Sequence, residues 1–100
     1  MFHKSWQTVY QDIEIVVHNS WNLLGTTVEE ILINGQQVHY LKKSFWLPQK
    51  RILGYRKDFE INGTHITVKV GNSPTGASMA CQILINGEYY DGDREVLFAE

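Results

Sequence analysis

Residues 30–38 read EILINGQQV, residues 82–90 read QILINGEYY, and between them residues 58–66 read DFEINGTHI. All three stretches contain Ile-Asn-Gly. Asn-Gly between apolar runs is a strong signal for a two-residue β-hairpin, because a type I′ turn needs positive φ at both central residues. The tripeptides start 28 and then 24 residues apart, and their flanks share only strand character. They therefore indicate three hairpin turns rather than three copies of a binding site.

Placing Asn-Gly at each turn predicts which residues face one another across the strands. One face of the middle hairpin then collects Phe59, Ile61, Ile66, Val68 and Val70, as expected for a half-buried ribbon. The predicted pairs are Ile33–Gln36, Ile31–Val38 and Glu30–His39 in the first hairpin, Ile61–Thr64, Glu60–His65 and Phe59–Ile66 in the second, and Ile85–Glu88, Leu84–Tyr89 and Ile83–Tyr90 in the third.

Alternating apolar residues also run through 7–21, QTVYQDIEIVVHNSW, which reads as one long strand in which Gln11 breaks the pattern. No stretch before residue 90 has a convincing helical period. The sequence predicts an all-β protein, 1–100 forming a single β domain, with an antiparallel β-sandwich of about seven strands. A small closed β-barrel is the alternative, since hairpin signals do not distinguish an open sheet from a closed one.

Composition excludes several classes of protein. The formal net charge is −2, and the single cysteine allows no internal disulfide. No apolar run approaches the ~20 residues of a membrane-spanning helix, and the N-terminus lacks the apolar stretch of a secretory signal. We expect a soluble, cytoplasmic protein with no membrane partner.

The usual catalytic and metal-binding patterns are missing. Cys81 falls on the apolar side of its strand, where cysteine acts as a small hydrophobe. The four histidines show no zinc-ligand spacing, and Asp91-Gly92-Asp93 lacks the later ligands of a calcium loop. The Glu30–His39 and Glu60–His65 pairs read as structural cross-strand pairs. We therefore expect no enzyme activity, no metal and no cofactor.

One stretch stands out by its charge. Residues 42–57, KKSFWLPQKRILGYRK, hold six of the nine basic residues and no acid, whereas the rest of the chain holds three basic and eleven acidic residues, a net charge of −8. Basic residues interleaved with aromatic ones suit a protein contact. The candidate binding residues are Lys42, Lys43, Phe45, Trp46, Lys50, Arg51, Tyr55, Arg56 and Lys57.

The leading functional hypothesis is a small non-catalytic binding module that contacts another protein through 42–57. A polyanion or nucleic-acid binder using the same surface is an alternative, although the acidic remainder makes nucleic acid unlikely. A second alternative is a small-ligand carrier or enzyme with an inter-sheet pocket. A third is that residues 42–57 bind nothing and their aromatic rings cover the core. A homodimer is also open. The exposure of Trp46 separates a binding surface from a core cover.

The motifs together resemble a known family. The order ILINGQQV, KKSFWLPQKRILGY, THITVKV and CQILINGEYY is similar to the β-sandwich module of the Fas apoptotic inhibitory molecule family, over about residues 28–90. The resemblance implies a non-enzymatic antiparallel sandwich that acts through protein contacts.

Overall fold

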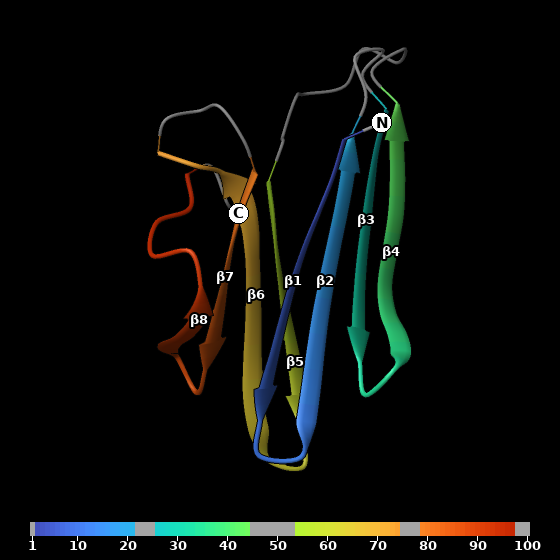
Figure 1. The fold of residues 1–100 in the computed structure, drawn as a ribbon. Helices are drawn as coiled ribbons and strands as arrows, with labels where there is room; N and C mark the ends of the chain where they lie inside the picture. The colour runs from blue at the N-terminus through green and yellow to red at the C-terminus, as the bar shows by residue number, and fades with distance from the viewer. Residues whose placement is uncertain (1, 22–25, 45–53, 75–78, 98–100) are drawn as a thin grey trace. The chain divides into compact units, whose positions relative to one another are not determined.

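The computed structural model describes residues 2–21, 26–44, 54–74 and 79–97. Within these ranges every regular element is a β-strand, and every pairing is antiparallel. Figure 1 shows the strands, which are β1 (Phe2–Tyr10), β2 (Ile13–Trp21), β3 (Thr26–Ile33), β4 (Gln36–Ser44), β5 (Tyr55–Ile61), β6 (Thr64–Asn72), β7 (Met79–Ile85) and β8 (Glu88–Gly92).

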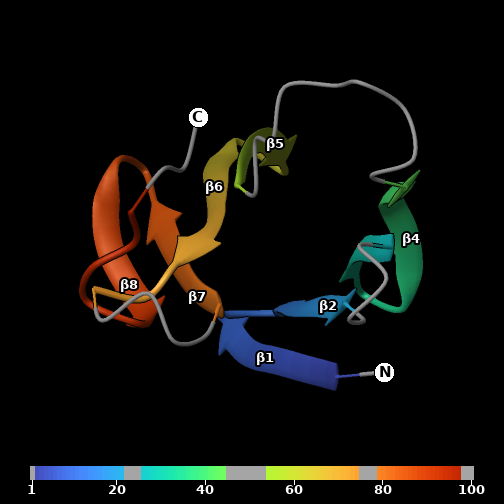
Figure 2. The ribbon, with the colours of Figure 1, turned by 90° about the horizontal axis from the view of Figure 1, so that it is seen from above.

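The chain divides into two compact units, Met1–Arg51 and Ile52–Glu100, each with one four-stranded sheet. The strands follow one another in chain order, β1-β2-β3-β4 in the first sheet and β5-β6-β7-β8 in the second. Figure 2 shows the two sheets end-on, the first in blue to green and the second in olive to red. The predicted all-β, antiparallel class is confirmed. Both described sheets are open, with β1, β4, β5 and β8 at their edges, so the closed-barrel alternative is wrong. The expectation of a single domain stays a prediction.

The described residues form eight strands where the sequence predicted about seven, because the stretch 7–21 contains a turn. The chain reverses at Gln11 and Asp12, and Tyr10 pairs with Ile13. Gln11 adopts a φ of 53°, in the left-handed region that few residues other than glycine, asparagine and aspartate occupy. The break that Gln11 makes in the apolar alternation is the sequence trace of this turn.

All three Asn-Gly turns are confirmed. Asn34, Asn62 and Asn86 have φ near +50°, and each following glycine has φ near +80°. Both central residues are therefore left-handed, as a type I′ turn requires. The middle hairpin keeps every predicted pair, from Ile61–Thr64 to Phe59–Ile66.

The other two hairpins each contain a β-bulge that shifts the predicted pairs. In the first hairpin Leu32 faces Gln37 but Ile31 faces His39, so Val38 is the extra residue. In the third, Leu84 faces Tyr89 but Ile83 faces Asp91, which makes Tyr90 the extra residue. The predicted pairs Ile31–Val38, Glu30–His39 and Ile83–Tyr90 are wrong for this reason. A bulge moves all later residues of its strand to the opposite face of the sheet.

The two units share one framework, residue by residue. Ile15 and Val17 of β2 face Ile33 and Ile31 of β3, just as Ile66 and Val68 of β6 face Ile85 and Ile83 of β7. All eight side chains are buried. The bulges also fall at equivalent places, on β4 and β8. The first and third Ile-Asn-Gly are thus equivalent, since they form the β3–β4 and β7–β8 turns. The second forms the β5–β6 turn, which corresponds to the β1–β2 turn at Gln11 and Asp12.

An asparagine at each equivalent turn joins three strands. The Asn34 side-chain oxygen accepts from the backbone N–H of Glu14 at 2.8 Å, and the backbone N–H of Asn34 donates to the Glu14 carbonyl at 2.9 Å. Asn86 repeats both bonds with His65, at 3.0 and 2.8 Å. Each turn of a β3–β4 or β7–β8 hairpin is thereby tied to the preceding strand.

Replacing these asparagines tests the tie. Asn34→Ala and Asn86→Ala remove the side-chain acceptor. Asn62→Ala is the control, because Asn62 has a similar φ but, in the described part of the chain, makes no such bond to a third strand. We expect the first two variants to lose about 1 kcal/mol more unfolding free energy than Asn62→Ala, the net value of one hydrogen bond. Chemical denaturation of the three variants measures the difference. Equal losses would contradict the tie.

A second prediction concerns Gly92, which closes β8 at a φ of +94°. A Cβ there would overlap the backbone carbonyl of Cys81, whereas a Cβ on Gly87, at a φ of +84°, meets open space. Gly87→Ala should cost about 1–2 kcal/mol from the left-handed backbone alone. Gly92→Ala should cost more, because the β7–β8 backbone must also move. Urea unfolding midpoints of the two variants check this, and a smaller loss for Gly92→Ala would refute it.

Candidate functional site

The structure describes only part of the predicted binding stretch. Lys42 is exposed near the end of β4, and the backbone of Lys43 pairs with Thr27. Tyr55 begins β5 and is only 7% exposed, so it belongs to the buried face and not to a binding surface. Arg56 and Lys57 are exposed. The predictions for Phe45, Trp46, Lys50 and Arg51 fall outside the described residues.

The two exposed cations of β5 have structural surroundings. Arg56 Nε lies 3.3 Å from Asp58 Oδ2, which partly neutralises its charge. Lys57 pairs with the buried Val68 and so lies on the same face of the sheet, but β5 is an edge strand. An inward-facing lysine on an edge strand discourages pairing with other strands. Of the described candidates, Lys42 is therefore the one best placed to contact a partner.

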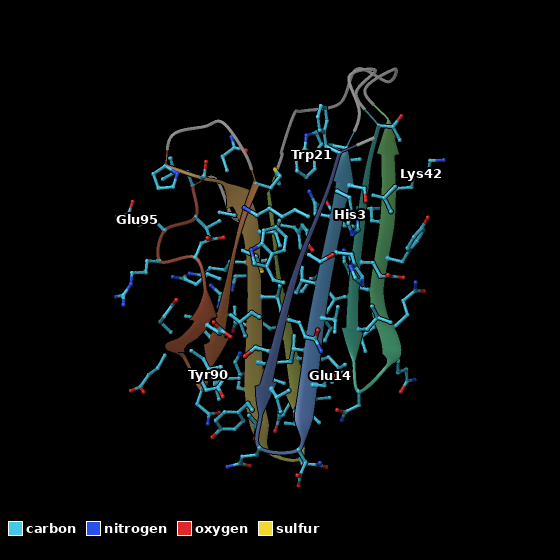
Figure 3. All side chains as sticks on the ribbon, viewed as in Figure 1. His3, Glu14, Trp21, Lys42, Tyr90 and Glu95 are labelled. Carbon is cyan, nitrogen blue, oxygen red and sulfur yellow. The ribbon has the colours of Figure 1, made fainter. Side chains whose placement is uncertain are left out.

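A hollow lies on the polar face of the first sheet. Its volume is about 290 Å³, and its described lining is polar except for one valine. Figure 3 labels His3, which lines it, and Lys42, which lies on the same face towards the same end of the sheet. We call this site the histidine hollow; it is lined by His3, His18, Ser20, Val28, Glu30 and Tyr40.

A chain of hydrogen bonds holds the histidine side of the hollow. His3 Nδ1 lies 2.8 Å from Ser20 Oγ, and His3 Nε2 lies 2.8 Å from Ser5 Oγ. Ser5 Oγ also lies 2.6 Å from His18 Nδ1. The two imidazole rings stack with centroids 5.5 Å apart. This network restricts both rings to one orientation, so the wall of the hollow is preorganised.

The opposite wall is built by Glu30 and Tyr40, which face each other across β3 and β4. Glu30 Oε2 accepts from Gln37 Nε2 at 2.7 Å. Tyr40 is 54% exposed. The bulge at Val38 is responsible for this pairing, because an unbroken register would have placed His39 opposite Glu30.

The second unit has none of this chemistry on the same framework. Counting along the matched registers, the residues equivalent to His18, Glu30 and Tyr40 are Lys69, Gln82 and Gly92. Ser5 and Ser20 likewise correspond to Arg56 and Gly71. Since the sheet forms with either set, the fold does not require the residues of the histidine hollow.

The buried face of the first sheet also carries polar groups. Asn19 and Glu29 face each other and are only 2% and 3% exposed. Glu29 Oε1 lies 3.2 Å from His39 Nε2. The equivalent residues of the second sheet are Val70, Cys81 and Asp91. Cys81 is fully buried there, as the sequence predicted.

Sequence reasoning missed the histidine hollow for two structural reasons. Alternation alone predicts one strand over residues 7–21, and this hides the facing of His3 and Ser5 against Ser20 and His18. The bulge at Val38 then hid the Glu30–Tyr40 pair. The available signal was Gln11, whose polar side chain interrupts the apolar alternation at the hidden turn.

Metal coordination finds little support in the described ranges. No group of three or more His, Cys, Asp and Glu side chains there is arranged to hold an ion. Nor do those ranges contain a helix long and apolar enough to cross a membrane.

Comparison with protein-family models, with curated proteins and with solved structures finds no match to the chain. The resemblance to the Fas apoptotic inhibitory molecule family therefore stays a prediction.

Asp58 on the second sheet has a lowered pKa, which makes it testable by pH. The largest cause is the hydrogen bond from Thr67 Oγ1 at 2.6 Å, and hydrogen bonds from His65 at 3.0 Å and Arg56 at 3.3 Å add to it against partial desolvation. Together they lower the pKa from 3.8 to about 2. A carboxylate with a depressed folded-state pKa stabilises the fold above its unfolded-state pKa.

The stabilisation by Asp58 should therefore be complete above about pH 4 and be lost as the pH falls from 4 to 2. Asp58→Asn should flatten the pH dependence of the melting temperature in that window. Because the carboxylate is 39% exposed, solvent screening keeps the effect modest. Glu60→Gln, an exposed carboxylate on the same strand, is the control. An unchanged pH profile for Asp58→Asn would contradict the assignment.

Proposed function

We propose that the chain is a small non-catalytic binding module that contacts another protein through the polar face of its first sheet. The observation that carries this is the histidine hollow, whose side chains are absent from the equivalent positions of the second sheet. Polar side chains that a framework does not need, and that are held in place by one another, are typical of a recognition site. Lys42, from the originally predicted stretch, extends the same face.

Binding suits the hollow better than catalysis does. Ser5 and His18 are close enough for a nucleophile and its base, but the Ser5 hydroxyl is shared with His3. Acyl transfer also needs backbone donors aimed at a developing oxyanion. On the face of a sheet the N–H groups lie in the plane of the ladder, where paired strands use them. The arrangement therefore supports recognition.

A polyanion suits the described surface less well than a protein does. Of the described residues that line the hollow, Glu30 is the acidic one, and none is a lysine or an arginine. Arg56, from the basic stretch, already has Asp58 as its ion-pair partner. The described lining of the hollow thus lacks the row of cations that phosphate binding uses.

Partner capture with matched substitutions tests the proposal. The double variant His18→Lys and Glu30→Gln puts the second unit's residues into the hollow, and Lys69→His with Gln82→Glu is the mirror-image control. We expect the first to lose at least tenfold in partner capture and the second to retain it, both with melting temperatures within a few degrees of the parent protein.

A third variant examines the basic stretch itself. Lys50→Glu with Arg51→Glu reverses two charges of residues 42–57. If this variant loses capture while the hollow variant keeps it, the contact surface is the basic stretch and the histidine hollow is not the site.

A further inference from the structure

We infer that the histidine hollow takes a cationic side chain of the partner, an arginine guanidinium held between Glu30 and Tyr40. This inference rests on the proposed function, because it names the group that the proposed contact surface recognises. It follows from the charge, the aromatic surface and the hydrogen-bonding state of the hollow, which are taken in turn.

The charge inside the hollow is negative. Glu30 uses Oε2 to accept from the Gln37 amide, and a carboxylate has room for about four hydrogen bonds. The remaining acceptor sites match the parallel N–H donors of a guanidinium, which binds carboxylates in a bidentate manner.

The aromatic surface lies directly opposite that carboxylate. Tyr40 faces Glu30 in the register and is more than half exposed, so a face of its ring is open to a cation. Val28, one step further along β3 on the same face, gives the methylene stem of an arginine an apolar surface to lie on. Carboxylate, ring and apolar floor are the three surfaces that an arginine side chain uses.

The histidines form a hydrogen-bonded wall beside this site. The Ser5 hydroxyl has one hydrogen and two lone pairs, so it can donate to one imidazole and accept from the other. The bonds from Ser20 through His3 and Ser5 to His18 can then all run in one direction. The two stacked rings give the hollow a polar wall next to Glu30.

Among the described residues on this face, a cation lies beside the hollow: Lys42 opposes Val28 in the register and is exposed on the edge strand β4. It competes with a bound guanidinium, since like charges repel. The second sheet supplies an internal comparison, because Gln82 and Gly92 stand where Glu30 and Tyr40 do, and neither charge nor ring remains.

The test is an NMR titration with two probes of matched shape. N-acetyl-arginine amide carries the guanidinium, and N-acetyl-citrulline amide replaces it with a neutral ureido group. We expect the arginine probe to shift the amide resonances of Glu30, Tyr40 and His18 saturably, with a millimolar Kd, and the citrulline probe to bind at least tenfold more weakly. Equal binding of both probes, or saturable shifts at those residues with inorganic phosphate instead, would overturn the inference.

Three variants locate the binding energy. Glu30→Gln and Tyr40→Leu should each weaken the arginine probe at least fivefold, whereas Lys42→Gln should strengthen it by removing a competing charge. Gln82→Glu is the control, since it adds a carboxylate to the second sheet without a facing ring and should create no second site. Weaker binding of the arginine probe by Lys42→Gln would show that Lys42 does not compete with the guanidinium and would refute the inference.

The outcome is separable from that of the proposed function. If capture depends on the hollow but the arginine probe does not bind, the partner presents another group and only the inference fails. If the hollow variant captures partners as the parent protein does, the proposed function fails whatever the probe shows.

Discussion

The side-chain amide at Asn34, and its equivalent at Asn86, is the contact on which each sheet depends. A left-handed Asn-Gly turn reverses the chain. The same asparagine bonds to the backbone of the preceding strand twice, accepting with its side-chain oxygen and donating with its backbone N–H. Three strands are thereby set in one register. Register decides which face of every strand is buried, because a slip by one residue inverts all of its side chains. The buried isoleucines and valines of both sheets follow from it.

Repetition of this framework lets equivalent positions of the two units be compared within one chain. The core positions at the centre of each sheet hold the same residues in both units, such as Ile31 and Ile83. Positions that differ occur on both faces. On the polar face His18 and Glu30 correspond to Lys69 and Gln82. On the buried face Asn19 and Glu29 stand where the second sheet has Val70 and Cys81.

The bulges connect the framework to the site. Each inserts one residue after an Asn-Gly turn and exchanges the faces of the rest of its strand. In the first sheet this brings Tyr40 opposite Glu30 and turns His39 towards Glu29. In the second it brings Gly92 opposite Gln82, where the absence of a side chain lets β8 close against Cys81. The same kind of bulge thus brings a tyrosine opposite a glutamate in one unit and lets the chain close in the other.

The sequence by itself determined the all-β class, the three Asn-Gly turns and the pairing of the middle hairpin, because turn chemistry and period-two alternation are local properties of the chain. Only the tertiary structure decided the extra turn at Gln11, the bulges at Val38 and Tyr90 and the equivalence of the two units. These depend on which neighbouring strand each strand meets, and apart from the break in alternation at Gln11, local patterns carry no record of that choice. The histidine hollow arises wholly at this second level, since its walls come from four strands that only the sheet brings together.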